Sequence, residues 1–179
     1  MDVTVASVGG LVSPPHLLPY ATAKFGAVGF SEGLSSALAG SGVTATTIAP
    51  GLMRTGSHER AFFTGQSEKE FAWFGPAASL PLLSMNADRA ARIIMDGVLA
   101  GKPTVLVGWL PKVAHRVHGL APELTTRAMG IANRLLPGAR SDQAGLREGR
   151  DAASGLNSKV VRALTTLGSK AARKNNERS

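Results

Sequence analysis

Three short apolar runs, rich in β-branched residues, are spread along the first two thirds of the chain. Residues 2–7 alternate and include Val and Thr, residues 43–48 are dominated by Val, Thr and Ile, and residues 103–107 repeat the pattern. Such residues favour the pleated backbone of a sheet. The sequence therefore predicts three strands.

Between these runs, apolar residues recur at helical spacing. Residues 19–38 carry a broad apolar face, and Gly40-Ser41-Gly42 is typical of a helix end. Residues 87–100 repeat this spacing after Asn86, a plausible helix cap. Strand, helix, strand, helix, strand predicts an α/β fold, with a right-handed crossover and ligands gathered beyond the carboxyl ends of the strands.

The segment at residues 52–84 holds most of the aromatic side chains. One interpretation is that they form the core of two short helices, because aromatic residues are mostly used for packing. The other is that they cover an apolar ligand. These side chains are Phe62, Phe63, Phe71, Trp73 and Phe74.

The last third of the chain changes character. Residues 109–136 have helical spacing interrupted by prolines, whereas residues 138–157 are rich in Gly, Ser, Asp and Arg and predict a linker. Residues 158–179 combine apolar residues at helical spacing with many cations. We expect a flexible, solvated tail there, and the alternative is a helix that lies weakly on a membrane surface.

Composition excludes several classes of protein. The chain has no cysteine, which excludes disulfides and thiol chemistry, and it has neither a signal peptide nor an apolar run of about 20 residues that could span a bilayer. We therefore expect a cytoplasmic protein. The net charge is +8, but residues 140–179 hold nine Arg or Lys and four Asp or Glu, so the remainder is only mildly basic and no nucleic-acid partner is predicted. His115 and His118 lack a third ligand nearby, so we predict no metal site.

The candidate chemistry centres on Tyr20 and Lys24. Residues four apart share one helix face, and a fixed positive charge beside a phenol stabilises the phenolate, so such a pair can handle a proton. Ser7 stands at the end of the first predicted strand, and Pro50-Gly51 and Thr55 follow the second.

This constellation resembles the short-chain dehydrogenase/reductase family. The likeness lies in Ser7-Val8-Gly9-Gly10, Tyr20-Ala-Thr-Ala-Lys24 with Phe25-Gly26-Ala27, and Pro50-Gly51 with Thr55, in this order and spacing. It is strong over residues 1–55 and looser over residues 56–136. The resemblance implies a partial doubly wound, Rossmann-like parallel sheet of three strands with flanking helices, formed by residues 1–137.

The resemblance also implies an NAD(P)-dependent oxidoreductase that transfers a hydride between the nicotinamide and a small alcohol or carbonyl. Ser7 would hold the substrate oxygen, Tyr20 would exchange its proton, and Lys24 would assist Tyr20 and reach the nicotinamide ribose. Pro50, Gly51 and Thr55 would flank the nicotinamide, and residues 52–84 would close over an apolar substrate. The resemblance does not distinguish NAD from NADP, and a full-length form is expected to be a homo-oligomer.

The departures from the family pattern concern the cofactor. Four parts of the family pattern have no counterpart in this chain: the Gly-rich turn, the residue that binds the ribose, the Asn-Ala-Gly element and the helix-borne asparagine. Gly9-Gly10 lacks a third glycine at the right offset, and Gly40-Ser41-Gly42 stands between a helix and a strand, the reverse of the required order. We therefore expect a carboxyl-terminal portion that is incomplete and inactive by itself. The alternative is a shortened paralogue that acts as an interaction or dimerisation module.

Overall fold

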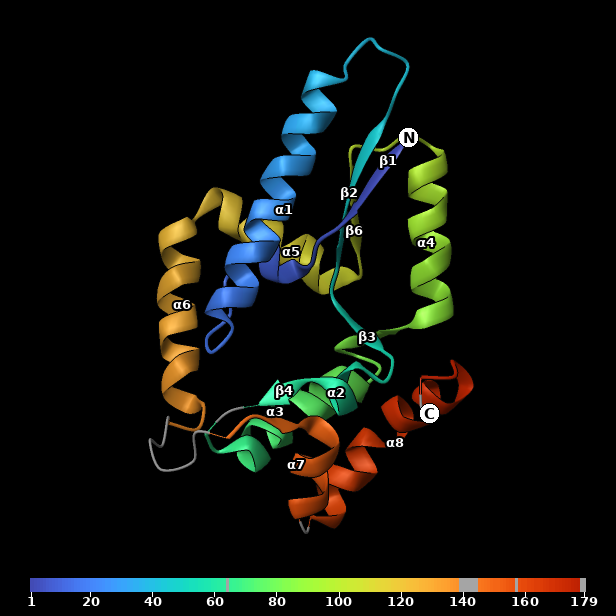
Figure 1. Ribbon diagram of the computed structural model, residues 1–179. Helices are drawn as coiled ribbons and strands as arrows, with labels where there is room; N and C mark the ends of the chain where they lie inside the picture. Colours follow the sequence, from blue (N-terminus) through green and yellow to red (C-terminus); the bar gives the residue numbers. More distant parts are fainter. Residues whose placement is uncertain (64, 139–144, 157, 178–179) are drawn as a thin grey trace. The chain divides into compact units, whose positions relative to one another are not determined.

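The computed structural model describes residues 1–63, 65–138, 145–156 and 158–177. The chain forms two compact units, each considered by itself: the first comprises Met1–Gly51 and Asp88–Asn133, and the second comprises Leu52–Ala87 and Arg134–Ser179. Figure 1 shows their helices and strands. The division separates the predicted catalytic tyrosine, in the first unit, from the aromatic segment, in the second.

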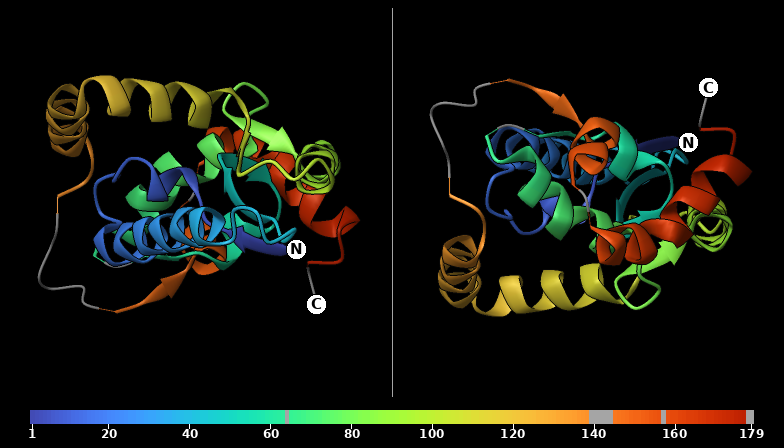
Figure 2. Two further views of the ribbon diagram at one scale, coloured as in Figure 1. Left: turned by 90° about the horizontal axis from the view of Figure 1, so that it is seen from above. Right: turned by 90° about the horizontal axis from the view of Figure 1, so that it is seen from below.

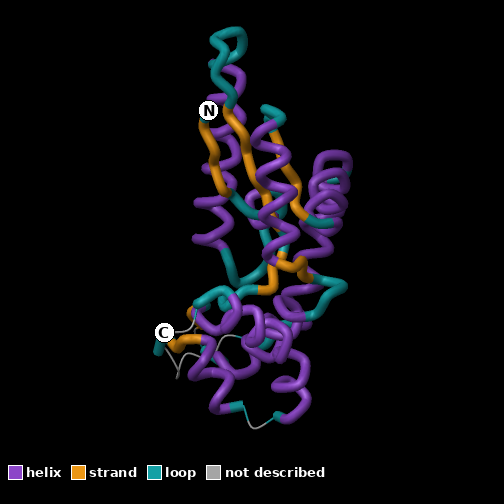
Figure 3. Tube along the Cα trace, turned by 90° about the vertical axis from the view of Figure 1, so that its right-hand side faces the viewer, coloured by secondary structure: helices purple, strands orange, loops and turns teal. Residues whose placement is uncertain are grey.

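The first unit is built on a three-stranded parallel sheet with strand order β1-β2-β6. Val5 pairs with Ile48, which in turn pairs with Val105, and all six residues of β2 are buried. Figure 3 shows these strands side by side. Its elements are β1 (Asp2–Val5), a 3-10 turn (Val8–Gly10), α1 (Leu18–Ala37), β2 (Ala45–Pro50), α4 (Ala87–Leu99), β6 (Thr104–Val107), α5 (Trp109–Leu120) and α6 (Pro122–Leu135).

Helices α1 and α4 cover opposite faces of this sheet (Figures 1 and 2). Alternate residues of a strand point to opposite faces. Accordingly, Leu106 packs with Val28 of α1 in the core cluster, whereas the neighbouring Val105 lies against Gly97 of α4 so closely that a Cβ there would overlap it. The predicted α/β fold with a partial Rossmann-like parallel sheet is confirmed.

The predicted elements of the first unit are found with small shifts. The second strand begins and ends two residues later than expected, at Ala45–Pro50, so Pro50 is the last residue of the strand. Helix α1 ends at Ala37, where Gly40 and Gly42 adopt the positive φ angles of +81° and +79° that suit glycine. The prolines at 111 and 122 lie in the first turns of α5 and α6, where a missing N–H costs little.

The second unit is mainly helical. It contains β3 (Leu52–Arg54), α2 (Ser57–Arg60), β4 (Phe62–Phe63), α3 (Ser67–Ser79), β5 (Ser84–Asn86), β7 (Arg147–Glu148), α7 (Gly149–Gly155) and α8 (Lys159–Lys174). Two short strand pairs join distant parts of the chain: β3 lies parallel to β5, and β4 lies antiparallel to β7. Both α7 and α8 pack on α3.

The prediction of a linker and a flexible tail over residues 138–179 is wrong for the described part of that range. Residues 147–155 form β7 and α7, and α8 buries Thr165, Gly168 and Ala172. The composition misled because the buried positions of α8 are small residues, which contribute little to an apolar pattern. Residues 139–144 and 157 of the predicted linker and residues 178–179 of the tail lie outside the described residues.

Among the helices that the structure describes, none is both long and apolar enough to cross a lipid bilayer.

Candidate functional site

Ser7 lies just beyond the carboxyl end of β1. Val5 pairs with Ile48, and two residues further on Ser7 and Pro50 stand at the same edge of the parallel sheet. The Ser7 Oγ accepts a hydrogen bond of 3.2 Å from the Gly9 N–H and caps the 3-10 turn that follows. This turn fixes Ser7 at the edge where α/β sheets bind their ligands.

Tyr20 and Lys24 lie one turn apart on α1. Val5 is the last residue of β1, and its carbonyl accepts a 3.1 Å hydrogen bond from the Lys24 Nζ. The Lys24 Nζ also lies 5.7 Å from the centre of the Tyr20 ring. Tyr20 itself is 43% exposed. The strand end therefore anchors the ammonium group beside a phenol that a ligand can reach.

Gly9 and Gly10 allow the turn and the helix to approach each other. A Cβ at residue 9 would lie 3.0 Å from Tyr20 Cε1 and 3.7 Å from Ser7 Oγ, so Ser7 and Tyr20 flank this glycine. A Cβ at residue 10 would lie 2.5 Å from the Lys24 carbonyl oxygen, closer than real side chains approach a backbone. Both glycines are thus needed for packing that brings Ser7, Tyr20 and Lys24 together.

Pro50 and Gly51 end the neighbouring strand. The Gly51 N–H donates to the Val107 carbonyl at 3.0 Å, and a Cβ at residue 51 would lie 3.0 Å from Pro111 Cδ of α5. Because its N–H is used inside the unit, Gly51 can offer a ligand only its carbonyl and its shape. Pro50 is buried.

Thr55 belongs to the second unit, whereas the other five predicted site residues belong to the first. Its Oγ1 donates to Ser57 Oγ at 3.0 Å and accepts from the Ser57 N–H at 3.3 Å. In this structure the hydroxyl thus orders the start of the short helix α2.

The nicotinamide dinucleotide that the resemblance implies fits these residues only in part. Tyr20 and Lys24 present a half-exposed phenol and an ammonium at the ligand-binding edge of the sheet, as a ribose and nicotinamide require. Tyr20 and the Lys24 backbone occupy the space beside Gly9 and Gly10, so these glycines form no cradle for a pyrophosphate. The start of α1 carries Pro19, which has no N–H to offer a phosphate. The described residues therefore fit the nicotinamide-ribose end alone.

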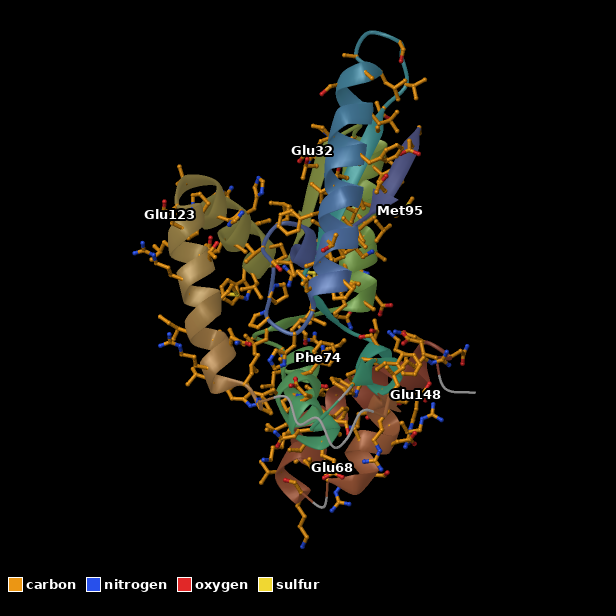
Figure 4. The ribbon with its side chains drawn as sticks, turned by 60° about the vertical axis from the view of Figure 1, so that its left-hand side comes forward. Glu32, Glu68, Phe74, Met95, Glu123 and Glu148 are labelled. Atoms are coloured by element: carbon orange, nitrogen blue, oxygen red, sulfur yellow. The ribbon has the colours of Figure 1, made fainter. Side chains whose placement is uncertain are left out.

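The aromatic segment packs mainly within the second unit. Phe71 is 2% exposed, and the Phe63 ring stands edge-on to it at 6.1 Å between centroids. Phe63 contacts Phe74, labelled in Figure 4, at 5.9 Å. Phe62 and Trp73 are 62% and 56% exposed. Three of the five aromatic residues thus form core contacts, whereas Phe62 and Trp73 expose more than half of their surface.

A buried polar cluster in the second unit was missed by the sequence reasoning. His58 is 1% exposed and its Nε2 lies 3.9 Å from Glu59 Oε1, to which Ser169 of α8 donates a 2.8 Å hydrogen bond. His58 Nδ1 is 3.1 Å from the Thr55 carbonyl oxygen. The adjacent His-Glu pair was a visible signal, but its partner is 110 residues away and no local pattern connects them.

The structure also shows what His118, one of the two histidines considered as metal ligands, contacts. His118 Nδ1 lies 2.7 Å from Thr125 Oγ1, so it links α5 to α6. Within the described ranges, no group of three or more His, Cys, Asp or Glu is placed to hold a metal ion.

Comparisons with known proteins match parts of the chain of different lengths. Residues 3–63 match the family described as short chain dehydrogenase. The chain is 34% identical over 136 residues to 17-beta-hydroxysteroid dehydrogenase 13 of Homo sapiens, an alignment that covers 74% of this chain and 39% of that protein. It is 31% identical over 130 residues to 17-beta-hydroxysteroid dehydrogenase 13 of Rattus norvegicus, covering 71% and 38%.

A shorter and closer match reaches estradiol 17-beta-dehydrogenase 11 of Homo sapiens, with 47% identity over 57 residues, 30% of this chain and 19% of that protein. The chain thus spans about two fifths of the length of the first two relatives.

Proposed function

We infer that the chain is a member of the short-chain dehydrogenase/reductase family, because residues 3–63 match the family and 136 residues align with a relative, and we propose that it carries the proton-transfer end of an NAD(P)-dependent oxidoreductase. The reaction would convert an alcohol to a carbonyl or the reverse. The observation that supports this most directly is the Lys24 ammonium, held 3.1 Å from the Val5 carbonyl beside the Tyr20 ring.

Each residue has a separate role in this proposal. Ser7 donates a hydrogen bond to the substrate oxygen, while Tyr20 exchanges the proton of that oxygen as general acid or base. Lys24 places a positive charge beside the Tyr20 ring and is proposed to reach the nicotinamide ribose. The cofactor, when bound, supplies the hydride. The Pro50-Gly51 backbone is proposed to border the nicotinamide.

The substrate is proposed to be apolar. The relatives support this, since they are named as dehydrogenases of hydroxysteroids and estradiol.

The first arm of the test uses the fact that Tyr20 is the only tyrosine of the chain. With ring-labelled tyrosine, nicotinamide mononucleotide should shift the single tyrosine resonance, with an affinity on the order of millimolar because the ligand is small. Adenosine monophosphate should not shift it. Lys24→Met should weaken the response, whereas Ala23→Ser, an exposed change next to Lys24, should not. An unchanged resonance at saturating mononucleotide contradicts the proposal.

The second arm measures chemistry. When the cofactor-binding half of a relative is fused ahead of Met1, Tyr20→Phe should lower hydride transfer by about 10²–10⁴-fold, the range of general acid-base catalysis, without disturbing ring packing. Ala23→Ser is again the control. Turnover of Tyr20→Phe above roughly a tenth of the unchanged fusion would rule out Tyr20 as the proton donor.

A second candidate function, an interaction module without turnover, is favoured by one observation. Phe30 and Phe25 of α1 are 66% and 38% exposed, although a helix on a sheet usually turns large aromatic residues inward. Binding of the mononucleotide at Tyr20 and turnover by the fusion would favour the enzyme. Self-association through α1 without either would favour the module.

A further inference from the structure

Helix α8 is attached to the second unit through its small residues. Thr165, Gly168 and Ala172 are its buried positions, and they follow one another at spacings of three and four on one face. A Cβ at residue 168 would lie 2.5 Å from Ser79 Oγ of α3 and 2.7 Å from the His58 ring. The face is therefore in close contact with its neighbours and cannot simply be rotated outward.

Polar contacts fix the orientation of α8 further. Ser169 donates to the Glu59 carboxylate at 2.8 Å, and just beyond the helix the Glu177 carboxylate accepts from the Gly56 N–H. Both partners lie in or next to α2. The direction in which the other faces of α8 point is thus determined.

Three of the four large apolar residues of α8 lie on an exposed side, and only Val161 turns toward the buried face. Val160, Leu164 and Leu167 are 66%, 39% and 45% exposed, and their spacings of four and three place them in one stripe. An ordinary surface helix buries such residues and exposes small or polar ones. In α8 the buried positions hold Thr, Gly and Ala, and three of the four large apolar residues stay exposed.

Cations border this stripe. The helix contains Lys159, Arg162, Lys170, Arg173 and Lys174 and no acidic residue. At 3.6 residues per turn, Lys159 and Lys170 fall beside the stripe, on the side away from the buried face, and both are exposed. Their long stems can extend past the apolar residues and place the ammonium groups above an apolar layer.

From this arrangement we propose that α8 is a membrane-surface helix, whose Val160–Leu164–Leu167 stripe enters the headgroup boundary of a bilayer while Lys159 and Lys170 bind anionic phospholipids. An amphipathic helix with cations beside its apolar stripe has the form that interfacial helices take. The charge favours this occupant over a second copy of the chain, because two such faces would bring cations against cations. The proposal concerns where the protein acts and does not depend on turnover at Tyr20.

The first test is co-sedimentation of the full chain with vesicles. Vesicles of equal parts phosphatidylserine and phosphatidylcholine should bind the chain at least tenfold more strongly than phosphatidylcholine alone, and added salt should weaken the binding. Leu164→Ser with Leu167→Ser, or Lys159→Gln with Lys170→Gln, should each lower binding about tenfold or more.

Matched controls use residues elsewhere that are at least as exposed as Leu164 and Leu167. Leu124→Ser with Ile131→Ser removes two apolar side chains of α6 that are 62% and 60% exposed, and Lys69→Gln with Lys102→Gln removes two exposed cations outside α8. Neither pair should change the binding. Equal loss with the control pairs would show general adhesion and overturn the proposal.

The second test does not depend on the variants of the stripe being folded equally well. Because the chain has no cysteine, Leu164→Cys and Ile131→Cys each give a single labelling position. A polarity-sensitive fluorophore should shift to the blue with anionic vesicles at residue 164 and remain unchanged at residue 131. No shift at 164, equal shifts at both, or a shift at 164 that depends on protein concentration without vesicles would overturn the proposal, the last in favour of a second copy.

Discussion

The two units differ in how far apart in the sequence their contacts lie. In the first unit, β1, α1 and β2 follow one another within the first 50 residues and make their main contacts among themselves and with β6. In the second, α3 packs on α7 and α8, and Phe62–Phe63 pairs with Arg147–Glu148. The comparison shows that the residues proposed for proton transfer stand on a locally determined framework, whereas the aromatic segment acquires its structure from contacts with the end of the chain.

A corollary concerns the polar groups of each unit. The first keeps Ser7, Tyr20 and Lys24 at least partly exposed at the sheet edge, while the second buries His58 and Glu59 against α8. Exposed polar groups at an edge are available to ligands. Buried ones are held by contacts within the protein and stabilise a particular packing.

The largest expected effect tests whether the aromatic segment is core. Phe71→Ala should lower the free energy of unfolding by about 3–5 kcal/mol, because a buried ring that contacts Phe63 and His58 is lost and leaves a cavity. Trp73→Ala, on the exposed side of the same helix, should cost less than about 1 kcal/mol. Chemical denaturation measures both.

Hydrogen exchange can then locate the damage. Phe71→Ala should lower the protection of α3 and α8 while β2 stays protected. Equal loss of protection in β2 would show that the two units do not differ in the way proposed.

A smaller effect is expected at the contact between the glycine turn and α1. Gly10→Ala should lower the free energy of unfolding by about 1–3 kcal/mol, because its Cβ meets the Lys24 backbone and the helix must move. Gly26 lies in α1 with open space around it, so Gly26→Ala should raise the free energy of unfolding by about 0.5–1 kcal/mol. Thermal and urea denaturation measure the pair, and a harmless Gly10→Ala would argue against the close approach.

The smallest effect concerns the buried cluster. Ser169→Ala removes the hydrogen bond from α8 to Glu59 and should cost about 1 kcal/mol. Ser36→Ala, whose hydroxyl bonds only to the Glu32 carbonyl within α1, should cost nothing measurable, because alanine is the better helix former. If both changes have the same effect, the link between α2 and α8 contributes nothing to the second unit.

The sequence by itself determined the sheet, the helix that carries Tyr20 and Lys24, and the place of Ser7 and Pro50 at the strand ends. Those features follow from local periodicity, β-branched runs and turn residues, each of which acts over a few residues. Only the tertiary structure decided the conformation of residues 145–156 and 158–177, because the buried positions of α8 are Thr165, Gly168 and Ala172, small residues that contribute little to an apolar pattern. The tertiary structure likewise decided that Phe71 lies in the core and that Ser169 donates a hydrogen bond to Glu59. It also decided that α1 occupies the space beside Gly9 and Gly10. Those outcomes rest on contacts between residues far apart in the chain, which no local pattern encodes.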